Sequence, residues 1–235
     1  MSREQVLEAL DNMPQESSHL LMVGLLASSK TLRGETNKYP NRFPIIGELP
    51  LIAPLDADPR ELRLIHFSTG DEGQGQLTSS MRQIRDILGW RGFVHGFQLN
   101  MVWPNAKAIK DGSRLGDRIV LQIGPRAMRV GGGYTETAKR VADYGDAITD
   151  VLVDGSGGKG VPLDTDLCLR YLEAIAERSP NIGLGVAGGL CQETLHLIHP
   201  IRARFPEVNI DAEGCLRTND QLDRMKVQRY LRDAL

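Results

Sequence analysis

Short apolar runs rich in β-branched residues alternate with longer segments of helical period from one end of the chain to the other. This alternation restricts the fold more than any other feature, because it is typical of parallel βα units. Eight runs are predicted to be strands, at residues 19–26, 44–52, 62–67, 96–102, 118–123, 148–153, 181–186 and 208–212. The pattern predicts an α/β fold in which one eight-stranded (β/α) barrel, a TIM barrel, spans residues 1–235 as a single domain. An open doubly wound sheet is the alternative.

The segments between these runs have the pattern of helices that cover a barrel. One helical face gathers the apolar residues Leu77, Met81, Ile84 and Leu88. Two stretches fit the alternation less well. The second predicted strand contains Pro50, which cannot donate to a β-ladder, and residues 30–43 are rich in polar residues, proline and glycine and are predicted to form a loop.

Charge and cysteine content exclude several classes of protein. The chain has 28 Lys and Arg against 30 Asp and Glu, and this balance provides no basic field for a nucleic-acid partner. Charged residues interrupt the first ten positions, so no signal peptide is expected, and no apolar run is long enough to cross a bilayer. The three cysteines, Cys168, Cys191 and Cys215, have neither CxxC spacing nor close pairing, and reduced thiols in the cytoplasm are expected.

Three predicted strands in the second half of the chain end in glycine-rich turns, at residues 154–160, 187–190 and 211–214. Glycine lets backbone N–H groups approach a ligand closely, and in barrels a phosphate typically lies on the loops after the last two strands. We therefore predict that the turns bind a phosphorylated small molecule. The phosphate-binding residues would be Gly157, Gly158, Lys159, Gly188, Gly189 and Gly214. In the alternative interpretation the glycines are simply required by tight turns.

Four segments carry a resemblance to a known family. The stretches DGSGGKGVPLD (154–164), VAGGL (186–190), IDAEG (210–214) and FQLN (97–100) resemble, in the same order, four motifs of phosphoribosylanthranilate isomerase. The resemblance covers roughly residues 95–216 and extends more loosely to other ribulose-phosphate-binding barrels. It implies an Amadori rearrangement of an aminoaldose phosphate, in which Asp154 matches the acid that opens the sugar ring. Asp211 matches the aspartate of the closing motif.

The match fails at the catalytic base. The family has a cysteine on the first strand, where this chain has Val23, and Asn100 replaces a histidine of the fourth strand motif. The closing turn has Glu213 in place of paired serines. His66, Glu48 and Glu213 are candidate substitutes for the base, although structural roles are the simpler interpretation of each. Cys191 and Cys215 follow glycine turns, where a thiolate would be stabilised, and packing is again the simpler role.

Two amides and one carboxylate complete the predicted site. Gln98 and Asn100 alternate with apolar residues, so they share one face of their strand, and together with Glu213 they are predicted to contact the substrate. No cofactor or metal is predicted, since the HxxH pair His196 and His199 lacks a third ligand. Two functions remain open at this stage, a sugar-phosphate isomerase with an altered base and a phosphate-binding barrel without catalysis. Either a monomer or a homodimer is compatible with the sequence.

Overall fold

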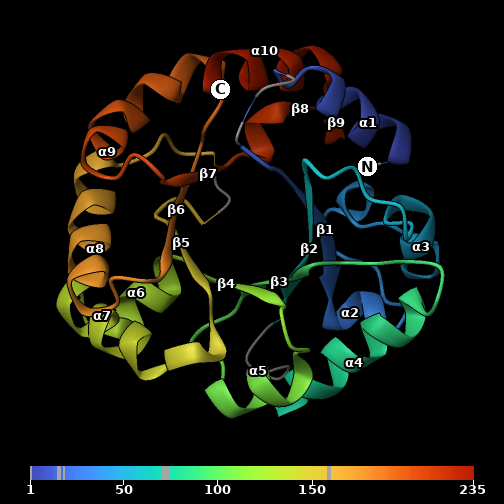
Figure 1. Cartoon of the computed structure of the whole chain (residues 1–235), viewed down its shortest axis with the longest axis horizontal. Helices are drawn as coiled ribbons and strands as arrows, with labels where there is room; N and C mark the ends of the chain where they lie inside the picture. The colour runs from blue at the N-terminus through green and yellow to red at the C-terminus, as the bar shows by residue number, and fades with distance from the viewer. Residues whose placement is uncertain (1, 15–16, 18, 70–74, 158–159) are drawn as a thin grey trace.

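A computed structural model of the chain describes residues 2–14, 17, 19–69, 75–157 and 160–235. Seven parallel strands form one sheet in chain order, and helices surround it (Figure 1). The strands are β1 (Leu21–Ser28), β2 (Glu61–Ser68), β3 (Gly96–Asn100), β4 (Arg118–Ile123), β5 (Asp150–Asp154), β6 (Gly183–Ala187) and β7 (Asn209–Asp211). A two-stranded antiparallel hairpin of β8 (Arg217–Thr218) and β9 (Gln221–Leu222) follows. The predicted α/β class with a parallel sheet is confirmed.

The helices in the described residues cover the outer face of the sheet. They are α1 (Arg3–Asp11), α2 (Ser29–Leu32), α3 (Leu49–Ile52), α4 (Leu77–Leu88), α5 (Ala106–Gly112), α6 (Pro125–Gly131), α7 (Tyr134–Asp143), α8 (Thr165–Arg178), α9 (His199–Arg204) and α10 (Arg224–Ala234). Short 3-10 turns are η1 (Pro40–Arg42), η2 (Ile46–Glu48), η4 (Gly145–Ala147), η5 (Gln192–Ile198) and η6 (Gly214–Leu216). None of the described helices is long and apolar enough to span a bilayer.

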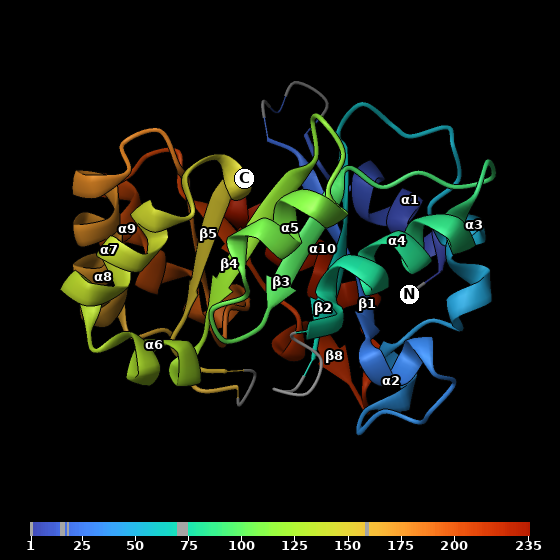
Figure 2. The same ribbon diagram turned by 90° about the horizontal axis from the view of Figure 1, so that it is seen from below.

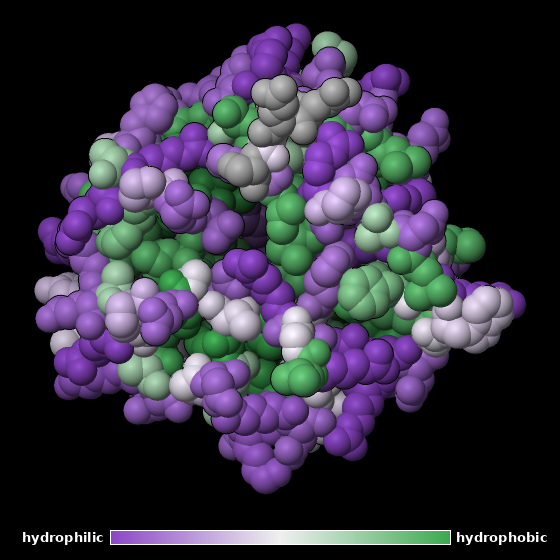
Figure 3. Space-filling model, in the orientation of Figure 1, coloured by the Kyte–Doolittle hydropathy of each residue, from purple (hydrophilic) through white to green (hydrophobic). Residues whose placement is uncertain are grey.

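The outer helices are amphipathic, as their apolar spacing predicts. In α4 the residues Leu77, Met81, Ile84 and Leu88 are all buried. On the face shown in Figure 3, hydrophilic residues predominate around the periphery, and hydrophobic ones lie mainly between them. Burial of one helical stripe against the strands therefore accounts for the layered packing.

The sheet curls strongly, but a closed eight-stranded ring is not observed. The side chain of Gln98 on β3 reaches Asp211 on β7 across the interior, with 3.3 Å between Nε2 and Oδ2. β1 and β7 are the two edge strands, and no ladder joins them in the described part of the chain. Outside this gap α1 and α10 lie side by side, linked by an ion pair between Glu8 and Arg224 (Figure 1).

The prediction of a strand at residues 44–52 is wrong. This stretch forms η2 and α3, and Pro50 occupies the first turn of α3, where its missing N–H costs nothing. The apolar residues Leu49 and Ile52 are buried because the helix packs against α4 on the outside of the sheet. The strands that follow are therefore each one place earlier in the strand order than predicted. Asp154, for example, ends the fifth strand, β5, rather than a sixth.

A buried arginine holds this helical connection to the sheet. Arg63 on β2 is fully buried, and its guanidinium donates to both carboxylate oxygens of Glu61, at 2.7 and 3.0 Å. It also donates to the backbone carbonyls of Pro54 and Asp56, while Arg3 binds Glu61 from α1 at 2.8 Å. Burial acts to raise the pKa of Glu61, but the hydrogen bonds from the two arginines outweigh it and lower that pKa.

Removing Arg63 should therefore destabilise the fold strongly. An Arg63→Met variant leaves the Glu61 carboxylate buried with only one partner and releases two carbonyls, so we expect a loss of about 3–5 kcal/mol in the free energy of unfolding. Urea unfolding measures it. The matched control is Arg33→Met, whose exposed pair with Glu35 should contribute little. Equal urea concentrations at the midpoint of unfolding for the two variants would contradict the role given to Arg63.

Candidate functional site

A cavity of about 460 Å³ opens at the carboxyl end of the strands. The segments that follow the strands, among them α2, α6 and β8, lie at this end, the lower one in Figure 2. Residues of the turns after β5, β6 and β7 line the cavity together, including Gly157, Gly188, Gly189 and Gly214. The predicted site residues Gly158 and Lys159 lie outside the described residues. The three glycine turns therefore meet at one opening, as the sequence predicts.

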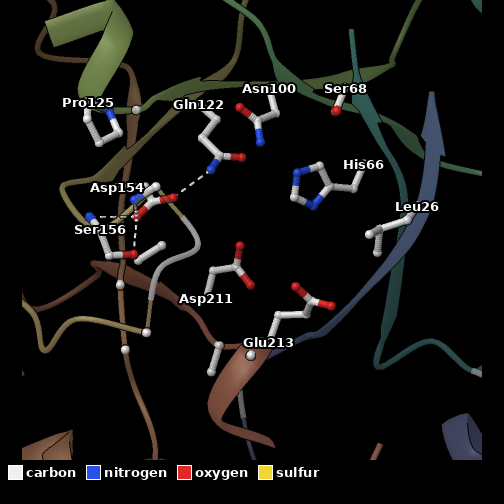
Figure 4. Close-up of a pocket in the computed structure, with 18 of the residues that line it drawn as sticks. Leu26, His66, Ser68, Asn100, Gln122, Pro125, Asp154, Ser156, Asp211 and Glu213 are labelled. Carbon is white, nitrogen blue, oxygen red and sulfur yellow. Dashed lines mark hydrogen bonds between the residues drawn. The ribbon is translucent and has the colours of Figure 1, made fainter. Parts of the chain in front are cut away.

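The floor of the cavity is polar. Alternate residues of a strand face the same side, and those that face the cavity near the strand ends are polar. His66 on β2, Asn100 on β3 and Gln122 on β4 contribute, and Asp154 and Asp211 end β5 and β7. Figure 4 shows these five side chains directed toward a common centre. In the sheet Asp154 pairs with Ala187 and Ala187 with Asp211, so the two aspartates lie in the same row, two strands apart.

Asp154 is engaged by the turn that it begins. Its Oδ1 accepts hydrogen bonds from the backbone N–H groups of Ser156 and Gly157, each at 3.0 Å, and from the Ser156 hydroxyl at 2.8 Å. Its Oδ2 accepts from Nε2 of Gln122 at 2.9 Å. The carboxylate therefore fixes residues 154–157, and the N–H of Gly157, which was predicted to bind phosphate, already has an acceptor.

Two glutamines connect Asp154 to Asp211. Nε2 of Gln98 donates to Oε1 of Gln122 at 3.1 Å and to Oδ2 of Asp211 at 3.3 Å. The hydrogen bond from Gln122 to Asp154 sets the direction of both bonds. Gln122 presents its amide nitrogen to Asp154, so its amide oxygen faces Gln98 and accepts from it. Gln98 is buried and lies outside the residues that line the cavity, whereas Asn100 is exposed to it. Of the two amides predicted to contact substrate, only Asn100 lies in the lining.

Asp211 is the carboxyl group suited to proton transfer. Burial raises the pKa of Asp211 above its usual range, and the charges of Asp154 and Glu213 add to the rise, while His66 and the hydrogen bond from Gln98 oppose it. The side chain of His66 lines the same cavity and points toward its centre (Figure 4). An aspartic acid that keeps its proton closer to neutral pH, beside an imidazole, provides an acid and a base within one cavity.

Glu213 belongs to an ion-pair cluster at the cavity rim. It accepts from Nε of Arg217 at 2.9 Å and from Arg42 at 3.3 Å, and Arg42 also binds Asp220. Arg42 lines the cavity, although it lies in the segment predicted to be a loop. No local pattern in the sequence marks Arg42 as a cavity residue, because its partner Glu213 is 171 residues away.

The turn after β6 requires glycine for packing. Gly188 and Gly189 have φ of +129° and +56°, and a Cβ on Gly189 would lie 2.4 Å from the carbonyl oxygen of Val161. A Cβ on Gly214, in contrast, would meet no atom within 4 Å. For the N–H groups of Gly189 and Gly214, the described residues provide no hydrogen-bond acceptor. Both glycines line the cavity, and the described part of the chain leaves their amides without a hydrogen bond.

Other residues singled out in the sequence lie elsewhere. Leu26 is the β1 residue that lines the cavity, so Val23, an odd number of positions away, is buried on the opposite face of the strand. Glu48 lies in η2, outside the lining. Cys215 does line the cavity, but burial raises the pKa of its thiol, contrary to the stabilised thiolate considered above. Among the described residues no group of His, Cys, Asp and Glu side chains forms a metal site.

Comparison with family models and with curated proteins found no match to the chain.

The raised pKa of Asp211 predicts a pH-dependent stability. Because the folded-state pKa lies above the value of about 3.9 for an unfolded aspartate, the stabilisation is complete below that pH and is lost as pH rises through the folded-state pKa. An Asp211→Asn variant lacks this titration. Urea unfolding from pH 4 to 8 should show wild type losing stability relative to the variant as pH rises. A difference that stays constant, or that grows in favour of wild type, would contradict the assignment.

Proposed function

We propose that the cavity binds a phosphorylated sugar derivative and isomerises it by proton transfer. The phosphate would accept hydrogen bonds from the N–H groups of Gly189 and Gly214, at the turns after β6 and β7. The observation that supports this most is that both turns line the same cavity as Asp211 and His66. Backbone amides at glycine turns are common anion ligands, and they provide the orientation that a small substrate needs.

The acid and base of this cavity suit an aldose–ketose rearrangement. Such a reaction protonates an oxygen bound to carbon one, removes a proton from carbon two and returns a proton to carbon one, so that the carbonyl forms at carbon two. Asp211, whose pKa burial raises, would hold the proton for oxygen, and His66 would accept the proton from carbon. Asp154 matches the family's acid in sequence, but its four hydrogen bonds favour a structural role in holding the β5 turn.

The resemblance to phosphoribosylanthranilate isomerase also bears on the fold and on the cellular compartment. We propose that the chain is a TIM-barrel relative in which seven strands curl around the cavity and α1 and α10 cover the place of an eighth. We propose the cytoplasm as its compartment, because the spacing of the three cysteines is typical of reduced thiols.

A phosphate-binding barrel without catalysis is the second candidate. Leu26 supports it, because it is the β1 residue in the cavity and it offers no proton acceptor, while Val23, at the position of the resembled family's cysteine, lies on the opposite face of the strand. In this case the same glycine turns would bind a phosphorylated regulator. Turnover, rather than binding, separates the two candidates.

Phosphate binding can be tested at Gly214, where a side chain meets no atom within 4 Å. Inorganic phosphate should raise the thermal unfolding temperature of wild type, because a ligand that binds the folded state stabilises it. Gly214→Asp places a negative charge at the proposed anion site and should abolish the shift, while Gly214→Ala should retain it. Equal shifts in all three proteins would place the phosphate elsewhere.

Catalysis can be tested with phosphoribosylanthranilate as a representative substrate. Replacing a general acid typically lowers the rate about 10²–10⁴-fold, so Asp211→Asn and His66→Gln should each lose activity to this extent. Asp146→Asn, a change at an exposed position, is the control. Phosphate binding without turnover in wild type would favour the non-catalytic barrel, and full activity of Asp211→Asn would rule out the role given to Asp211.

A further inference from the structure

The turns after β6 and β7 bring two cysteines together at the cavity rim. Cys191 precedes η5 and Cys215 lies within η6, and because β6 and β7 are adjacent parallel strands, their following turns lie side by side. Each cysteine lies four residues beyond the end of its strand, and the two strand ends pair in register, so the thiols occupy equivalent places on neighbouring turns. Besides burial, Cys191 also contributes to the raised pKa of the Cys215 thiol. Cys215 lines the cavity together with Gly189 and Leu190, the residues that lead into Cys191.

Both thiols are accessible, in contrast to the third. Cys191 and Cys215 are partly exposed, while Cys168 is completely buried in α8, where burial raises the pKa of its thiol to about 12. The Sγ of Cys191 is oriented by Oγ1 of Thr194 at 3.4 Å, and that hydroxyl in turn donates to the carbonyl of Gly189. One thiol is thus fixed on the glycine turn and the other faces the opening.

We propose that Cys191 and Cys215 form a reversible intramolecular disulfide across the cavity rim, with a peroxide or a small-molecule disulfide as the oxidant. A disulfide requires the two sulfurs to reach a bond length of about 2.05 Å, with the Cα atoms about 4.4–6.8 Å apart. The two short turns η5 and η6, rather than the strands, would take up this movement.

With hydrogen peroxide the reaction proceeds in two balanced steps. The thiolate of one cysteine attacks a peroxide oxygen, the O–O bond breaks, and hydroxide leaves, giving a sulfenic acid. The second thiol then displaces water from that sulfur and forms the S–S bond. Two thiols are oxidised, and the peroxide is reduced to two molecules of water. Because burial raises the pKa of Cys215, the reaction should accelerate as pH rises above neutrality.

The disulfide would join the two turns that carry the N–H groups of Gly189 and Gly214. If these amides bind phosphate, as proposed above, oxidation should change the affinity for it. This consequence rests on the proposed function, whereas disulfide formation itself does not.

The test treats the full chain with excess hydrogen peroxide and then alkylates the remaining thiols in denaturant. Mass spectrometry should find alkylation of Cys168 alone and a peptide pair cross-linked through Cys191 and Cys215, and dithiothreitol should restore all three thiols. Cys191→Ser and Cys215→Ser should each abolish the cross-link, while Cys168→Ser should leave it intact.

Three alkylated cysteines after oxidation, an intermolecular cross-link, or stable sulfenic or sulfinic acid on one residue without a cross-link would each overturn the proposal. The thermal shift produced by inorganic phosphate is measured in parallel on oxidised and reduced protein. If the cross-link forms but phosphate raises the unfolding temperature of neither form, the disulfide is established and the proposed phosphate site is rejected. The two failures are therefore distinguishable.

Discussion

A chain of hydrogen bonds across the inside of the curled sheet determines the geometry of the site. It runs from Asp154 through Gln122 and Gln98 to Asp211, and so joins β5, β4, β3 and β7. Two carboxyl groups in one apolar interior are costly unless donors satisfy them. The glutamine amides provide these donors, and because each amide has one donating and one accepting end, they also fix the orientation of both acids.

The two aspartates differ because their surroundings differ. Asp154 begins a turn and accepts four hydrogen bonds, so its lone pairs hold backbone and side chain in place. Among the described residues, Gln98 alone donates a hydrogen bond to Asp211, which faces the cavity, where burial and neighbouring carboxylates raise its pKa. Asp154 thus holds the β5 turn in place, and Asp211 has the raised pKa that the proposed proton transfer needs. The sequence motifs alone would instead assign the role of the acid to Asp154.

Local patterns predicted the parts of the structure that depend on local chemistry. Seven of the eight predicted strands overlap observed ones, and the glycine turns meet at one cavity because the carboxyl ends of parallel strands share an edge. Residues 44–52 have the composition of a strand, but Pro50 favours the start of a helix. Packing of that helix against α4 stabilises it. Arg42 with Glu213, and Cys191 with Cys215, depend on contacts between distant segments that no local spacing encodes.

We propose that the amides of Gly189 and Gly214 bind an anion in the cavity that Asp211 also lines. Titration of ¹⁵N-labelled protein with inorganic phosphate, followed by two-dimensional NMR, tests it residue by residue. If these amides bind the anion, the amide resonances of Gly189 and Gly214 should move together along one saturable binding curve. Unchanged resonances at both glycines, with shifts confined to surface lysines and arginines, would contradict it.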